Sequence, residues 1–293
     1  MATLRDIKRR VVGVKSTQQI TKAMKMIAAV KLRKAQSSII NARPYANNIA
    51  TVISKLPSEE DYSSNPFFEK REVKNVAVVV VTADRGLCGS FNQNIIKEAE
   101  RYIREELKAE SVNFELYCAG KKGADYFKKG NYKLFKTDTG IFSSLVFNSA
   151  LNIYDSIIPQ FLNGTFDKVV LIYNSFVSII SQKVVIQQLL PIQSEFTSDE
   201  VMLKDINYIF EPNRGHIFKY LIPKHLKTQV WRALLESNAA ELSARMTAMD
   251  NATTNAEEMI KSLNLTYNKE RQAAITKEIL EIVSGANALK SGS

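Results

Sequence analysis

Residues Lys224 to Ser284 read KHLKTQVWRALLESNAAELSARMTAMDNATTNAEEMIKSLNLTYNKERQAAITKEILEIVS. This run of 61 residues contains neither glycine nor proline, the residues that most often interrupt regular structure. Ala, Leu, Glu, Met and Lys, which favour helices, fill much of it. We therefore expect one helix of about 90 Å, because an α-helix rises about 1.5 Å per residue. Pro223 suits the first turn of such a helix, and Gly285 suits its end.

The N-terminal segment, residues 1–56, has the same texture. Thr3 and Asp6 are spaced like a capping box, and only Gly13 and Pro44 interrupt the helical pattern. A stripe with steps of three and four residues follows each segment: Leu4, Ile7, Val11 and Val14 in the first, and Trp231, Leu235, Asn238, Leu242, Met246, Met249, Thr253, Ala256, Ile260, Leu263 and Tyr267 in the second. The stripes predict that residues 1–56 and 213–290 pair as an antiparallel coiled coil. A conventional helix bundle is the alternative, but the middle of the chain supplies no other long helices.

The middle of the chain, residues 75–212, contains seven of the eleven glycines and alternates between strand and helix patterns. The expected strands are Val76 to Thr82, Phe114 to Ala119, Tyr132 to Thr137, Lys168 to Tyr173 and Lys183 to Leu190, with helices at Asn92 to Lys108 and Leu145 to Leu162. This alternation predicts a Rossmann-like α/β domain with a mainly parallel sheet. Residues 57–74, which include prolines and acidic residues, are expected to form the linker out of the first helix. The fold class is therefore α/β plus a long coiled coil.

The charge of the chain is unevenly distributed. The net charge is +10, yet residues 1–56 alone hold twelve Lys or Arg and a single acidic residue, Asp6. The excess positive charge therefore lies on the first helix. A long basic surface of this kind indicates an acidic partner, whether protein, nucleic acid or lipid headgroup.

No catalytic or cofactor site is expected. The turn from Asp84 to Ser90 follows the first strand, where a nucleotide-binding domain has its phosphate loop, but the chain contains neither GxGxxG nor GxxxxGK[ST]. A tight turn that needs small residues explains this segment better, and the same holds for Gly120 to Gly123. Cys88 has no neighbouring histidine that would make it a nucleophile. Two cysteines and two histidines are too few and too scattered for a metal cluster, so we expect buried free thiols.

Two segments of the long helices differ from an ordinary solvated face. From Ile20 to Val30 the apolar residues cover almost the whole circumference, and one partner helix cannot enclose such a segment. We call this segment the collar, and we expect another polypeptide to cover it. The second segment, Tyr267 to Glu281, mixes charged and amide side chains with Ala and Ile. Antiparallel pairing is expected to bring it alongside the first half of the N-terminal helix, near the collar.

The sequence shows no sign of membrane insertion or export. The apolar stretches, such as Val76 to Val81, are far shorter than the roughly 20 residues that span a bilayer, and Met1 is followed by no signal-peptide core. We expect the protein in the cytosol or on a cytosolic membrane face.

Several blocks resemble the gamma subunit family of the F-type ATP synthases. The C-terminal block ITKEILEIVSGANA, Ile275 to Ala288, is similar to the family signature at every defined position. Thr17 to Ala29 resembles its N-terminal block, Thr82 to Asn92 its central turn, and Ala244 to Thr253 part of its C-terminal helix. The cysteine insertion of the chloroplast type and a transit peptide are absent, which points to a bacterial enzyme. Lys25 departs from the acidic residue that some members carry beside the collar.

The resemblance implies a rotor shaft that couples proton-driven rotation of a membrane ring to conformational changes in a catalytic hexamer, without catalytic residues or cofactors of its own. The implied partners are the alpha and beta subunits of the hexamer, the epsilon subunit and the membrane c-ring, with one copy of the chain per complex on the cytoplasmic face of the bacterial cell membrane. The α/β domain is implied to form a foot that stands on the membrane ring with the epsilon subunit. The expected contacts of this foot are Arg85, Tyr208 and Glu211. The expected contacts with the hexamer are Arg9, Arg10, Met24, Lys25, Met26, Ile27, Arg271, Gln272, Thr276 and Glu278.

A basic coiled-coil protein that binds nucleic acid is the alternative function. It would use the positive charge of the first helix against phosphates. The segment from Lys8 to Lys34, however, lacks the aromatic residues on which single-stranded bases stack.

Overall fold

The computed structural model describes residues 3–55, 65–192, 211 and 213–291, except for the side chains at positions 54, 55, 214 and 288–291. The chain divides into two compact units, Met1–Ile27 with Met246–Ser293 and Ala28–Arg245. These boundaries differ from the expected ones, because both long helices are divided between the units. The larger unit contains the α/β domain together with the adjoining parts of both helices.

Two very long helices form the N-terminal and C-terminal parts of the described chain, as the sequence predicts. α1 spans Leu4–Lys55 and α6 spans Arg214–Ser291. The bounds of α6 agree with the expected range 213–290, but Pro223 and Gly285 do not mark its ends: Pro223 lies nine residues after the start, and the helix continues through Gly285. Asn213 supplies the missing start signal: its side-chain Oδ1 accepts the backbone N–H of His216 at 2.8 Å, and its carbonyl accepts that of Ile217.

The start of α1 confirms the predicted capping box. The backbone N–H of Asp6 donates to the hydroxyl of Thr3 at 3.3 Å, and the Asp6 carboxylate accepts both the hydroxyl and the backbone N–H of Thr3. These hydrogen bonds lower the pKa of the Asp6 carboxyl.

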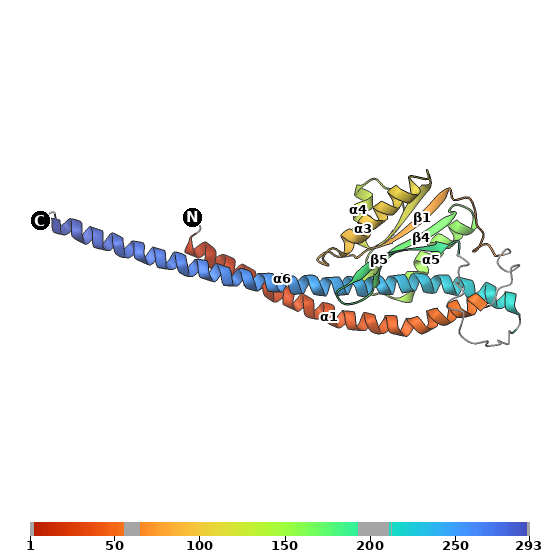
Figure 1. Ribbon diagram of the computed structural model, residues 1–293, viewed down its shortest axis with the longest axis horizontal. Coiled ribbons are helices and arrows are strands. Elements are labelled where there is room, and N and C mark those ends of the chain that lie inside the picture. The colour runs from red at the N-terminus through yellow and green to blue at the C-terminus, as the bar shows by residue number, and fades with distance from the viewer. Residues whose placement is uncertain (1–2, 56–64, 193–210, 212, 292–293) are drawn as a thin grey trace. The chain divides into compact units, whose positions relative to one another are not determined.

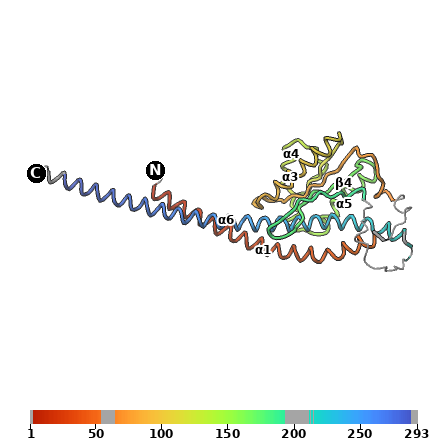
Figure 2. Tube along the Cα trace, in the orientation of Figure 1, coloured from red at the N-terminus to blue at the C-terminus, as the bar shows by residue number. Residues whose placement is uncertain are grey.

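Within the smaller unit, α1 and α6 lie side by side and antiparallel (Figure 2). The Thr21 and Thr253 hydroxyls form a hydrogen bond of 2.8 Å, and the Lys25 ammonium donates to Asp250 at 2.6 Å. From Thr21 to Lys25 the residue number on α1 rises, while that of the partner on α6 falls from Thr253 to Asp250. The two contacts therefore define the register of the antiparallel pair. None of the described residues of the predicted α6 stripe, from Trp231 to Tyr267, is fully exposed.

The α/β domain of the larger unit contains a mixed five-stranded sheet in the order β3-β2-β1-β4-β5 (Figure 1). β1, β2, β3 and β4 are parallel, and β5 pairs with β4 in the antiparallel direction. The five predicted strands are confirmed, with bounds β1 Asn75–Val81, β2 Asn113–Ala119, β3 Leu134–Asp138, β4 Lys168–Phe176 and β5 Gln182–Leu190.

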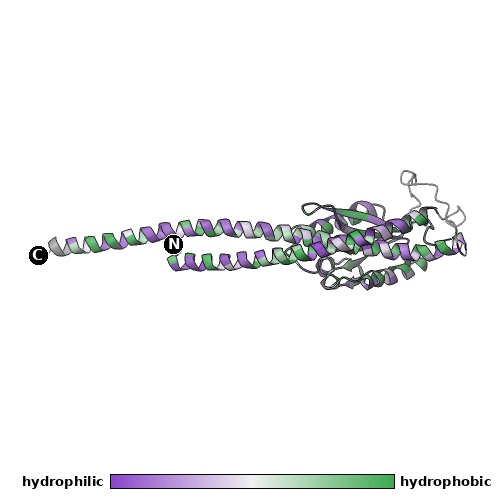
Figure 3. Cartoon of the chain, turned by 90° about the horizontal axis from the view of Figure 1, so that it is seen from below, coloured by the Kyte–Doolittle hydropathy of each residue, from purple (hydrophilic) through white to green (hydrophobic). Residues whose placement is uncertain are grey.

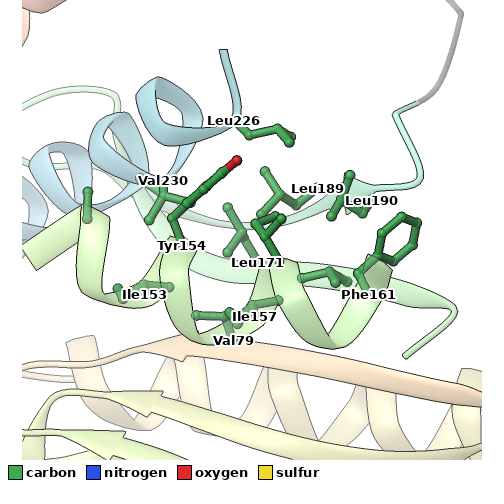
Figure 4. Close-up of a cluster of buried hydrophobic side chains, with 14 of the residues drawn as sticks. Val79, Ile153, Tyr154, Ile157, Phe161, Leu171, Leu189, Leu190, Leu226 and Val230 are labelled. Atoms are coloured by element: carbon green, nitrogen blue, oxygen red, sulfur yellow. The ribbon is translucent and has the colours of Figure 1, made fainter. Parts of the chain in front are cut away.

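Both faces of the sheet are buried, as expected for a parallel sheet. On one face, Val76, Val78 and Val80 of β1 pack with α3 (Phe91–Tyr102), the π-helix η1 (Ile103–Leu107) and α4 (Lys121–Lys129). On the other face, β1 packs with α5 (Phe147–Leu162) and with the buried side of α6 (Figure 4). A short 3₁₀ turn, η2 (Ile141–Ser143), precedes α5. This part of α6, from Phe218 to Leu234, thus belongs to the domain core.

Three sequence expectations need correction in this unit. The helix expected over Asn92 to Lys108 divides into α3 and the π-helix η1. α4 was not expected, because nine residues flanked by Gly120 and Gly130 and containing Gly123 look like a turn. Residues 57–74 are not simply a linker: within their described part, Phe67 and Phe68 are buried in the core, and Phe68 stacks on Phe218 of α6 at 5.5 Å between ring centroids.

Candidate functional site

The turn after β1 occupies the place of a phosphate loop, but its polar groups bind the protein's own backbone. The Asp84 carboxylate accepts backbone N–H groups of Lys121 at 3.0 Å, Gly140 at 2.7 Å and Phe142 at 3.2 Å. The three donors follow β2 and β3, so Asp84 ties the loops at the carboxyl edge of the sheet together. This carboxylate would also repel a phosphate.

The glycine-rich segment after β2 is closed by packing against Thr82. The Gly123 N–H donates to the buried Thr82 hydroxyl at 2.8 Å. Gly120 has a φ of +114°, and a Cβ there would lie 2.0 Å from the Thr82 carbonyl oxygen. Close backbone approach therefore explains these glycines, as the sequence analysis favours.

The two thiols are buried, as predicted. Burial raises the pKa of Cys88, and it raises the pKa of Cys118 to about 12. Neither is a reactive thiolate near neutral pH. Among the described residues, no group of three or more His, Cys, Asp or Glu side chains is placed to hold a metal ion.

The collar on α1 is covered on one side only. Thr21 and Ala28 are buried and Met24 is half-buried, whereas Met26 is 57% and Ile27 58% exposed. Ile20 and Val30 are exposed as well. Exposed large apolar side chains of this density indicate a contact surface for another molecule. Lys25, beside the collar, pairs with Asp250 across the two helices, with both side chains partly exposed.

The terminal part of α6 is a second uncovered segment. Arg271, Gln272, Thr276 and Glu278 are all exposed, and the Thr276 hydroxyl donates to the Gln272 carbonyl within the helix at 2.9 Å. Exposed apolar side chains lie among and just after them: Ile275, Ile279, Leu280, Ile282 and Val283. Ile275 and Ile279 were expected as part of the mixed segment from Tyr267 to Glu281, whereas Ile282 and Val283 lie beyond it. Figure 3 shows these apolar stretches beyond the N-terminal end of α1. These apolar residues occur on more than one side of the helix. This pattern in the sequence could have indicated a surface that contacts another molecule.

The register of the pair corrects the expected position of this segment. Because Thr21 lies opposite Thr253, the same antiparallel register places Ile7 opposite Tyr267. α1 begins at Leu4, so residues from Arg271 onward extend past its start. They are not beside the collar, which lies near Asp250. Arg9 and Arg10 are exposed, but this register places them opposite residues near 265, not opposite the polar group at 271–278.

The residues expected in the foot do not form one surface. Arg85 is exposed on the turn after β1, and that turn contacts Arg245 of α6 through the Gly86 carbonyl. Glu211 is exposed just before α6, and the 31 residues between Arg214 and Arg245 correspond to about 47 Å of helix. Arg85 and Glu211 therefore lie at opposite ends of this part of α6. Tyr208 lies outside the described residues.

The carboxyl edge of the sheet is closed by the domain's own backbone, and the two long helices have uncovered apolar surface. These features are typical of a stalk subunit in a larger assembly. Residues 3–289 match the family model described as ATP synthase. The ATP synthase gamma chain of Chlorobaculum tepidum is 51% identical over 293 residues, which cover 99% of this chain and all of that relative. The chain belongs to the ATP synthase gamma chain family.

Solved structures agree with this assignment. A chain of the central stalk and c-ring structure of the Tetrahymena thermophila mitochondrial ATP synthase is 29% identical, with a TM-score of 0.62, and the match covers 80% of this chain and 99% of that one. A chain of the Euglena gracilis mitochondrial enzyme has the same fold, with a TM-score of 0.70 at 22% identity, and the match covers 99% of this chain and 95% of that one.

The protein is a non-catalytic central stalk subunit, and the complex as a whole is the ATPase. The alternative of a nucleic-acid-binding coiled coil is not supported. Among the described residues, no helix is both long and apolar enough to cross a membrane.

Proposed function

We propose that the protein is the rotating shaft of a bacterial ATP synthase and couples proton-driven rotation of a membrane ring to the catalytic hexamer. The observation that carries this proposal is the uncovered apolar surface on two helical segments, the collar and residues 275–283. The exposed side chains of these two segments are not part of the folded core. Both have the character of a surface that turns inside a sleeve formed by other subunits.

The proposed partners are the alpha and beta subunits around the helices, and the epsilon subunit and c-ring around the foot, with one copy of the chain per complex. The Tetrahymena structure is itself described as a central stalk with a c-ring, which supports the ring as a partner. Glu211 remains a candidate foot residue, whereas Arg85 is at the other end of this part of α6. The proposed location is the cytoplasmic face of the cell membrane, with the chain held there by its partners.

Coupling follows from the asymmetry of the helical segments. A single helix presents different residues in different directions, so each catalytic subunit around it meets a different set of side chains. A rotation can then change which subunit is favoured in its open or closed state. Reversing such an equilibrium from 1:99 to 99:1 takes about 5.5 kcal/mol of differential contact energy.

Arg271, Gln272, Thr276 and Glu278 are the proposed angle-dependent polar contacts with the hexamer. Exposed ion pairs contribute only about 0 to 1 kcal/mol, but a charged hydrogen bond shielded from water contributes about 1.5 to 3 kcal/mol. These four side chains are exposed in the chain and lie on a segment that extends past α1. A surrounding subunit therefore has access to them from every side.

The test is steady-state ATP turnover by the assembled complex with Arg271→Leu or Gln272→Leu. We expect turnover to fall by about 10-fold to 100-fold, which corresponds to the loss of one shielded charged hydrogen bond. Helical circular dichroism of the chain should not change. Lys261→Leu is the matched control, since Lys261 is also exposed on α6 but outside the proposed contact segment. Turnover at the parent rate by both variants in an intact complex would remove these residues from the proposal.

A further inference from the structure

The buried side of α6 changes its chemistry within the larger unit. Its earlier part packs into the domain core mainly with the apolar side chains of Phe218, Ile222, Leu226, Val230 and Leu234. Only two of the described side chains buried there are polar, His225 and Thr228. From Glu236 to Ser243 the helix remains buried on nearly all sides, yet four of its buried side chains are polar: Glu236, Ser237, Glu241 and Ser243. Burial of polar groups is unfavourable unless they find partners, so this composition requires an explanation.

Glu236 and Ser243 bind the hairpin formed by β4 and β5. The Ser175 hydroxyl donates to the Glu236 carboxylate at 2.6 Å, and the same carboxylate accepts from Arg232 Nε at 2.9 Å. Two turns further along α6, the Ser243 hydroxyl donates to the Ile179 carbonyl and accepts from Gln182 Nε2 at 3.2 Å. A third contact lies earlier on α6, where Gln187 Nε2 of β5 donates to Gln229 Oε1 at 3.3 Å.

Arg245 attaches α6 to a different element, the turn after β1. Its guanidinium donates to the Gly86 carbonyl at 2.7 Å and is held in place by the carboxylate of Glu241, one turn earlier. Ala240 packs against Cys88 and Phe91 between these groups. The turn is also rigid on its other side, because Asp84 binds three backbone N–H groups there.

These contacts favour one position of the domain along and around α6. A purely apolar contact of similar volume is often at least as stable as a buried polar one, but it accepts a small slide or rotation more readily. Among the described residues, the buried Asn174 Nδ2 on β4 and Ser237 Oγ on α6 have no hydrogen-bond partner. This contact surface is therefore not optimised for stability alone.

We propose that Glu236, Ser243 and Arg245 are positioning residues that fix the rotational and axial register of the α/β domain on α6. In the assembled enzyme, torque between domain and shaft would pass through this set without slip. This consequence rests on the proposed function, whereas the register itself is a property of the chain alone.

The test measures the distance between spin labels on the full-length chain at Lys97→Cys on α3 and Lys219→Cys on α6, both exposed positions. The native cysteines are buried and their thiol pKa values are raised, so they label more slowly. The variant combines Glu236→Met, Ser243→Ala and Arg245→Met. The control, Leu226→Ala with Val230→Ala, weakens the apolar part of the same contact.

We expect the distance distribution of the polar variant to broaden about twofold or more, and that of the folded control to keep the parent width. If the triple variant does not fold, Ser243→Ala alone removes one hydroxyl and is expected to broaden the distribution in the same direction. An unchanged width in the folded variant would overturn the proposal. So would an equal broadening in the control, since the effect would then follow from general loosening.

A second measurement separates this proposal from the function on which it rests. In the reconstituted complex, the variant is expected to hydrolyse ATP while the number of protons pumped per ATP falls severalfold. A broadened distribution with an unchanged pumping ratio would retain the register but overturn the torque role. If the parent complex itself showed no coupled pumping, the proposed function would fail while the distance result still stood.

Discussion

Two stretches of α6 show what a single helix can be used for. One side of residues 218–243 is buried in the larger unit, against the sheet and α5, whereas every described side chain from Ile275 to Asn287 is exposed. Both stretches are α-helical without interruption. The first is held by packing, and the second by the intrinsic preference of its residues with the support of pairs such as Lys277 and Glu281. The exposed apolar residues in the second stretch therefore do not contribute to the folded core, which supports the proposal that they contact other subunits.

The largest expected difference between the two stretches is in stability. Phe218 is fully buried and stacks on Phe68, so Phe218→Ala should lower the free energy of unfolding by about 3 to 5 kcal/mol. Leu280→Ala, in the exposed stretch, should change it by less than about 0.5 kcal/mol. Urea unfolding of the full-length chain measures both values. Equal losses would contradict the distinction between a packed and an unpacked part of α6.

The buried stretch should also make the free energy of unfolding depend on pH, through His225. Burial lowers the pKa of His225 from 6.5 to about 4, so the folded chain holds this imidazole neutral. Because the folded-state pKa lies below the unfolded one, the contribution of His225 is complete above about pH 6.5 and is lost as pH falls toward 4. At pH 5 the loss should be about 2 kcal/mol relative to pH 7.

Unfolding of the His225→Gln variant at these two pH values isolates that contribution, since the variant should lose less stability between pH 7 and pH 5 than the parent does. His216→Gln is the matched control, because His216 is exposed near the start of the same helix. A parent and a His225→Gln variant with the same pH dependence would show that His225 is not the titrating group.

In the collar we expect the opposite result: a substitution there should affect coupling in the assembled enzyme more than the stability of the chain. Met24 is half-buried, so Met24→Lys should cost only about 1 kcal/mol of unfolding free energy. In the assembled enzyme, the added charge should disturb the contact at some angles, and the protons pumped per ATP should fall by about half or more. Parallel assays of ATP hydrolysis and proton pumping measure this ratio. If both rates kept their original ratio, the collar would not be the surface against which the shaft turns.

The smallest effect is expected at the ion pair beside the collar. Lys25 and Asp250 are 2.6 Å apart, but their side chains are 40% and 52% exposed. Water screens such a pair, so a double-mutant cycle with Lys25→Met and Asp250→Asn should give a coupling energy of about 0 to 1 kcal/mol. A value above about 2 kcal/mol would indicate that this part of the helix pair is less solvated than the exposure of the side chains suggests.

Local patterns predicted most of the architecture. Absence of Gly and Pro from Lys224 to Ser284, the stripes of three and four residues and the short β-rich runs identified both long helices and all five strands. Each of these signals depends on residues close together in the chain. Whether a segment forms a helix or a strand is determined largely by such neighbouring residues. A phosphate-loop motif is also a local pattern, so its absence could be recognised from the sequence. The contacts of Asp84 and Thr82 show what these turns do instead: their polar groups bind the backbone of the domain itself.

Tertiary structure alone decided how these elements meet. The register that places Ile7 opposite Tyr267, and so leaves Arg271 to Glu278 beyond the start of α1, follows from which side chains of two long stripes interlock. A repeating stripe is compatible with several such registers. The separation of Arg85 from Glu211 and the attachment of Glu236, Ser243 and Arg245 to the sheet domain likewise depend on partners distant in sequence. No local pattern predicts these contacts, because the partner of each buried polar side chain comes from a part of the chain distant in sequence.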